Sequence, residues 1–108
     1  MEYIDYQLKE KDWKLFRQKL PEWQEAYMEK LVEEYKKILN SDERASAKYW
    51  ELEKKVRKDK RNSGVLACDI RRSRFELLLL QLIRDGVITV EDLADFSAEL
   101  QERIKFIL

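Results

Sequence analysis

The stretch from Phe75 to Ile88, FELLLLQLIRDGVI, constrains the fold of this chain more than any other. Leu77, Leu78, Leu79, Leu80, Leu82 and Ile83 would cover nearly the whole circumference of a helix, and a helix that is apolar on all sides is a buried one. Charged residues flank the run too closely for it to span a bilayer. Other helices, from this chain or from a second copy, must therefore cover it.

The composition favours helices along the rest of the chain. Its 108 residues include only two glycines and one proline, and 41% of them are charged. Few turn residues mean long elements with short connections, and a chain of this length forms one domain. We therefore expect an all-α protein: a small antiparallel bundle of four main helices plus a short N-terminal helix, in one domain that covers residues 1–108.

Apolar spacing and turn residues divide the chain into an N-terminal arm, residues 1–8, and five helices. Pro21 is expected to mark a helix boundary or a sharp kink, because proline clashes with the preceding helical turn but suits the first position of a new helix. Gly86 is expected to end the leucine-rich helix, and Thr89 with Asp92 resembles a capping box for the last one. The predicted helices span residues 9–19, 21–39, 43–61, 65–85 and 90–106.

The zero net charge conceals a strongly basic middle block. Residues 54–74 hold nine basic and two acidic residues, a net charge of +7, whereas residues 1–53 carry −3 and residues 75–108 carry −4. Such a block could contact nucleic-acid phosphates. It could also be solvated or neutralised by the acidic helices, which is the interpretation we favour. The candidate partner- or phosphate-binding patch consists of Lys54, Lys55, Arg57, Lys58, Lys60, Arg61, Arg71, Arg72 and Arg74.

Large apolar residues are more numerous than a core of this size needs. Small helical proteins commonly bury such an excess by self-association, most often with two-fold symmetry. We therefore expect a homodimer. The candidate apolar interface consists of Trp13, Phe16, Leu79, Leu80 and Ile83.

The sequence offers little material for catalysis or for a cofactor. It contains no histidine, the usual general base near neutral pH. Cys68 could be reactive beside Arg71 and Arg72, but a small buried residue is the favoured interpretation. Glu91, Asp95, Glu99 and Glu102 recur along one helical face, which is more typical of a solvated or ion-paired face than of a metal site. We expect no enzyme activity, no metal and no cofactor.

Residues 87–108, VITVEDLADFSAELQERIKFIL, allow two interpretations. They could form a helix-turn-helix unit, with Ser97 and Ala98 in the turn. The second helix would then present Glu99 and Glu102 to DNA, which is a poor surface for that purpose. A single continuous helix over residues 90–106 is therefore favoured.

Three blocks, KDWKLFRQKLPEWQEAYMEKL, YWELEKKVRKDKR and DGVITVEDLADFSAEL, resemble a group of short, mostly uncharacterised, all-helical bacterial proteins of unknown function. The resemblance covers nearly the whole chain. It implies a bacterial, intracellular, self-contained unit, and it carries no activity, cofactor or site residue.

Two functions from different classes follow from these patterns. The first is a non-enzymatic helical protein–protein interaction module, homodimeric, with exposed aromatic and arginine residues as hot spots: Trp13, Trp50, Arg57 and Arg72. The alternative is a nucleic-acid-binding accessory or regulatory protein that uses the basic patch at residues 54–74. A single cysteine and an N-terminus without a signal peptide favour the cytoplasm, and no membrane partner is expected.

Overall fold

A computed structural model describes residues 9–108, and all its regular elements are helical. The predicted all-α class is confirmed. The predicted arm, residues 1–8, lies outside the described residues. Within residues 9–108, no helix combines the length and the apolar character that crossing a bilayer requires. The α-helices are α1 (Glu10–Leu39), α2 (Ala45–Asp59), α3 (Phe75–Arg84) and α4 (Ala98–Ile107), and two short 3₁₀ helices are η1 (Arg72–Arg74) and η2 (Val90–Leu93).

α1 is one continuous helix of 30 residues that contains Pro21 in its interior. The prediction of two helices, 9–19 and 21–39, was therefore wrong. The apolar positions on either side of the proline keep the same helical spacing, from Trp13 and Leu20 to Trp23 and Tyr27. A single helix can bury both stretches on one face, which offsets the roughly 3 kcal/mol that an internal proline costs. Pro21 itself is exposed, so its ring needs no space in the core.

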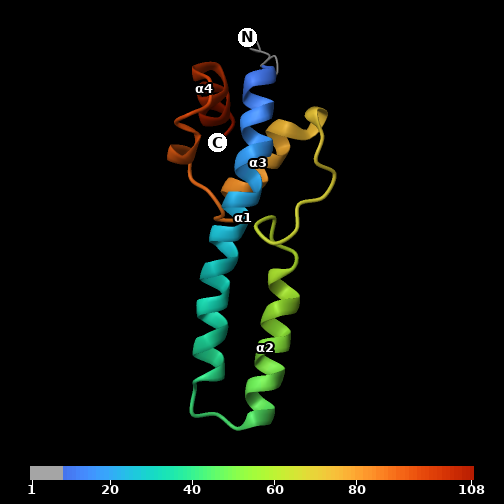
Figure 1. Cartoon of the computed structure of the whole chain (residues 1–108), viewed down its shortest axis with the longest axis vertical. Helices are drawn as coiled ribbons and strands as arrows, with labels where there is room; N and C mark the ends of the chain where they lie inside the picture. The colour runs from blue at the N-terminus through green and yellow to red at the C-terminus, as the bar shows by residue number, and fades with distance from the viewer. Residues whose placement is uncertain (1–8) are drawn as a thin grey trace.

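The molecule is elongated, with extents of 59 × 28 × 24 Å. Figure 1 shows α2 antiparallel to the C-terminal half of α1, whereas α3, η2 and α4 gather around the N-terminal half. The expected antiparallel bundle of four main helices plus a short N-terminal helix is not confirmed, since α3 and α4 have only ten residues each and the N-terminal helix is part of α1. The main core lies where the short elements meet α1, and its residues are Trp13, Phe16, Leu20, Phe75, Leu78, Leu79, Leu80, Leu82, Ile88, Leu93, Phe96, Leu100 and Ile104.

The leucine-rich helix begins ten residues later than predicted, at Phe75 rather than near residue 65. The reason is topological. The N–H and hydroxyl of Ser63 both donate to the carboxylate of Asp85, at 3.0 and 2.7 Å, so the turn after α2 lies at the C-terminal end of α3. The chain must therefore return along α3 to reach its first residue, and residues 66–71 do so as an irregular connection.

Both predicted signals after α3 are confirmed. Gly86 has a φ of +77°, and the Val87 N–H donates to the Leu82 carbonyl at 2.9 Å, as in a Schellman cap. The Thr89 N–H donates to the Asp92 carboxylate at 2.7 Å, which completes a capping box with Asp in place of Glu.

The last predicted helix, 90–106, is interrupted. η2 ends at Leu93, and α4 begins only at Ala98. Ser97 caps α4, because its Oγ accepts from the Leu100 N–H at 3.3 Å. The break falls where the helix-turn-helix interpretation put its turn, but the element before it is a single 3₁₀ turn rather than a helix.

Candidate interaction surface

The α1–α2 hairpin is held at its middle by a cluster of charged and phenolic groups. The Tyr35 hydroxyl donates to Asp59 Oδ2 at 2.7 Å, and Lys55 Nζ lies 3.2 Å from the same carboxylate and 3.5 Å from Glu34. Burial of Tyr35, together with its hydrogen bond to Asp59 and the charge of that group, raises the pKa of Tyr35 to about 12. Burial alone would lower the pKa of Lys55, but the hydrogen bonds to Asp59 and Glu34 and the charges of these two carboxylates together outweigh it and raise the pKa. These contacts fix the register of α2 on α1.

The turn after α2 forms a second anchor. Asn62 Nδ2 donates to the Tyr27 hydroxyl at 3.0 Å, and Gln24 Nε2 donates to the Ser63 carbonyl at 3.0 Å. Gly64 follows in close contact, since a Cβ at this position would lie 2.4 Å from the Tyr27 ring. The turn is therefore fixed against α1, and the hairpin extends from here as a pair of helices.

Beyond this turn the hairpin has almost no buried core. Within Ala45–Asp59 no side chain is fully buried, and Leu31 is the one buried residue of α1 beyond Leu20. Large apolar side chains are exposed instead: Val32 by 47%, Leu39 by 50%, Tyr49 by 64% and Trp50 by 63%. Two helices can bury only the stripe where they face one another, so the adjoining apolar positions stay in solvent.

Most of these exposed residues share one side of the hairpin. The Lys55–Glu34 ion pair marks the opposite side. Successive residues of a helix are rotated by about 100° around its axis, so on α1 the side chain of Val32 points away from that of Glu34. On α2, Tyr49 and Lys55 lie on opposite sides of Leu52. A shallow depression between Met28 and Val32 lies on the same side. We call this surface the apolar flank, and it consists of Met28, Val32, Leu39 and Tyr49.

The nine basic residues of the predicted patch do not form one surface. Arg72 pairs with Glu10 at 2.6 Å, whereas Lys55 pairs with Glu34. Glu10 and Glu34 are 24 residues apart on one helix, or about 36 Å. Even Asn62, which follows Arg61, contacts α1 at Tyr27, about 25 Å from Glu10. The predicted single patch at one end of the bundle was therefore wrong.

Five of the nine basic residues also have acidic partners within the chain. Lys55 pairs with Glu34 and Asp59, Arg57 with Glu53, and Arg72 with Glu10. Arg71 and Arg74 both contact Asp69, at 2.7 and 3.4 Å. In the described part of the chain no ion pair engages the remaining four, which are Lys54, Lys58, Lys60 and Arg61.

Two of these four, Lys54 and Lys58, lie on the outer surface of α2, away from α1, and Arg61 lies in the turn just after it. Lys54 and Lys58 follow Trp50 at spacings of four, so these three residues share one helical face. The Trp50 ring stands edge-on to Tyr49, with 5.0 Å between the centroids. We call this surface the basic face, and it consists of Trp50, Lys54, Arg57, Lys58 and Arg61.

The predicted apolar interface is inside the chain's own core. Trp13, Phe16, Leu79 and Leu80 are buried, and Ile83 is partly buried against them. The predicted hot spots include both exposed and buried residues. Trp50 and Arg57 are exposed on α2, whereas Trp13 is buried beneath the Arg72 guanidinium. The prediction of the interface residues was therefore wrong, because α1 and α3 cover one another's apolar residues within the chain.

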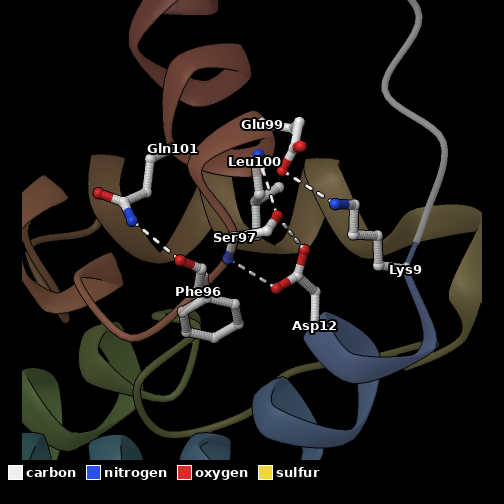
Figure 2. A network of polar contacts seen from close by, with 7 residues as sticks. All are labelled: Lys9, Asp12, Phe96, Ser97, Glu99, Leu100 and Gln101. Atoms are coloured by element: carbon white, nitrogen blue, oxygen red, sulfur yellow. Dashed lines mark hydrogen bonds and ion pairs between the residues drawn. The ribbon is translucent and has the colours of Figure 1, made fainter.

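Two acidic residues near the C-terminus pair with lysines at the N-terminal end of the described chain. Figure 2 shows buried Asp12 accepting from the N–H and the hydroxyl of Ser97, at 2.9 and 2.6 Å. Glu99 pairs with Lys9 at 3.0 Å, and Asp95 pairs with Lys19 at 3.4 Å. Among the described residues, no group of three or more such side chains is placed to hold a metal ion.

Cys68 is exposed, contrary to the expectation of a small buried residue. It lies in the irregular connection that leads back to η1, not near the start of a helix. The helix N-terminus that could have activated its thiol is therefore not beside it in the chain.

The sequence pattern did not predict the apolar flank. Met28, Val32 and Leu39 widen the apolar face that begins with Trp23 and Tyr27 on the same helix. That width was the available signal, because a stripe broader than one neighbour can cover must have a second partner or face solvent. Comparison with known proteins adds no template for this surface: no family model, curated protein or solved structure matches the chain.

Proposed function

We propose that this protein is a non-enzymatic helical module that works by binding another protein through the apolar flank of the α1–α2 hairpin. The observation that carries the proposal is a hairpin that leaves three large apolar side chains, Val32, Leu39 and Tyr49, exposed on one side. Exposed clustered apolar surface is characteristic of protein-binding sites. The single cysteine, Cys68, supports a reducing compartment, and we place the module in the cytoplasm.

A site-specific photo-crosslink tests this function. Val32 is replaced with p-benzoylphenylalanine, and the full chain is irradiated in its native cells. Leu77 provides a matched control, because it is an apolar side chain on α3 that is 57% exposed and lies outside the flank. We expect a nuclease-resistant, protease-sensitive adduct from position 32 and none from position 77. Equal adducts from both positions, or no protein adduct from position 32, would contradict the proposal.

A second candidate function, nucleic-acid binding, is favoured by the basic face. Lys54, Lys58 and Arg61 are cations without an ion pair in the described part of the chain, and exposed Trp50 stands beside them. Lysine and arginine bind phosphates, and an aromatic ring can stack on an unpaired base. This function would use α2 and the turn just after it rather than the whole block at residues 54–74.

Fluorescence anisotropy of labelled single- and double-stranded nucleic acids, across a salt series, separates the two functions. Phosphate binding must weaken steeply as the salt concentration rises. It should be lost when Lys54, Lys58 and Arg61 are changed to Glu. The control changes three other exposed cations to Glu, namely Lys11, Lys14 and Arg17 on the N-terminal part of α1. Absence of binding at low salt would exclude this candidate.

A further inference from the structure

We infer that the partner of the apolar flank is a second copy of this chain, packed with the two α1 helices antiparallel and with Val32 on the two-fold axis. The inference rests on the proposed function and deepens it by naming the partner. Two hairpins joined in this way would form a four-helix bundle. That is the natural way for a pair of amphipathic helices to bury a second apolar stripe.

The stripe that would meet its copy is symmetric along α1. Counted from Val32, Glu25 and Leu39 lie seven residues before and seven after, and Met28 and Lys36 lie four before and four after. A two-fold axis at Val32 would place Glu25 opposite Leu39 of the other copy and Met28 opposite Lys36 of the other copy. Each of these pairs would occur twice, as in any isologous interface.

The charges along the stripe make the antiparallel arrangement favourable. Glu25 and Glu29 lie on the N-terminal side of Val32, and Lys36 lies on the C-terminal side. In the antiparallel arrangement Glu29 of each copy lies near Lys36 of the other, so the dimer gains two pairs of opposite charge. A parallel arrangement would bring Glu29 close to Glu29 and Lys36 close to Lys36. Such like-charge contacts oppose association.

Existing contacts leave these charged groups available. Lys36 has a partner within the chain, Glu33 at 3.0 Å, but both side chains are more than half exposed and their pairing is weak. Tyr35 bonds to Asp59 of α2, and Leu31 is buried on the same side of α1. The proposed dimer contact uses a different side of α1, so it leaves the contacts between α1 and α2 intact.

Sedimentation equilibrium of the purified full chain tests the inference. We expect particles of two chains. Changing Glu29→Lys or Lys36→Glu should raise the dimer dissociation constant by about tenfold, because each change creates two like-charge contacts per dimer. The double variant, with the charges exchanged, should return to within about threefold of the parent. Lys30→Glu is the control, since Lys30 lies on the other side of α1 and should leave the constant unchanged.

A substitution on the axis gives an independent measurement. Val32→Glu would place two carboxylates on the axis and should yield a monomer whose helical circular dichroism matches that of the parent. A dimer that tolerates Val32→Glu, or single charge variants that the exchange does not rescue, would overturn the antiparallel arrangement. A protein that stays monomeric to about 100 µM overturns the inference. If position 32 then still crosslinks to a different protein, the proposed function survives, and if it crosslinks to none, both fail.

Discussion

At the scale of single residues, Asp12 shows how one buried carboxylate can fix an entire helix. It lies near the start of α1, yet it accepts both hydrogen bonds from Ser97, the residue that caps α4 (Figure 2). The bond joins residues 85 positions apart in the sequence. Ser97 in turn accepts from the Leu100 N–H, so Asp12 orients the cap and, through it, the first turn of α4.

Replacing Asp12 with Ala should lower the free energy of unfolding by about 2–3 kcal/mol, because it leaves the Ser97 N–H without its acceptor in a partly buried place. Ser97→Ala removes the hydroxyl only and should cost about 1 kcal/mol. Urea denaturation of both single variants and of the double variant measures the two effects and their coupling. An Asp12→Ala protein as stable as the parent would show that α4 is held by its apolar residues alone.

Tyr35 provides a prediction for alkaline pH. Its pKa is raised to about 12 from the ordinary value of 10.0, so the folded state binds the phenolic proton more tightly than the unfolded state. The resulting stability is complete below pH 10 and is lost as the pH rises from 10 towards 12. Tyrosinate absorbance near 295 nm, compared between the parent and Tyr35→Phe, should show one group that titrates near 12. A difference spectrum with a midpoint near 10 would contradict this result.

At the scale of the elements, α3 is less uniformly buried than its run of leucines indicates. Leu78, Leu79, Leu80 and Leu82 are in the core, but Leu77 is 57% exposed. Neighbouring elements therefore cover most sides of α3 but leave the side that carries Leu77 uncovered. α2 packs along the C-terminal half of α1 and does not cover this side of α3.

Two leucines of α3 should therefore respond differently to truncation. Leu79→Ala should cost about 2–5 kcal/mol of unfolding free energy, because it opens a cavity in the core. Leu77→Ala should change it by less than about 0.5 kcal/mol. Thermal or chemical denaturation of the two variants measures this contrast. Equal losses would mean that Leu77 is covered in solution, and α3 rather than the hairpin would then be the place to look for a partner.

At the scale of the whole molecule, the chain consists of a packed head and a two-helix extension. The Cα radius of gyration is 17.3 Å, whereas a compact domain of 108 residues has about 13 Å. Nearly all buried residues lie in the head, around the N-terminal half of α1. Local stability follows buried apolar contact, so the extension should be the less stable part of a single chain.

Hydrogen exchange can measure this difference. In the monomeric Val32→Glu variant, backbone amides between residues 28 and 56 should exchange faster than those of α3 and α4. In the parent at high protein concentration, the proposed dimer should protect the same hairpin amides, because binding of a second copy would stabilise the folded hairpin. Uniform protection along both parts of the monomer would contradict the division into head and extension.

The sequence by itself determined the helical class, the central place of most of the leucine block and the signals at Gly86 and Thr89, because these depend on local spacing and local backbone geometry. Only the tertiary structure decided the rest. Pro21 stays within one helix because both stretches of α1 bury the same face. Residues 66–71 remain irregular because the hydrogen bonds from Ser63 to Asp85 hold the preceding turn at the far end of α3. α4 starts at Ala98 because Asp12 binds its capping residue, Ser97. The candidate site follows the same division. The basic cluster was visible in the sequence, but long-range contacts separate it into two sets of residues in the fold. The packing of α2 on α1 leaves the apolar flank uncovered. Such contacts join residues distant in the chain, and no periodicity within a single helix specifies them.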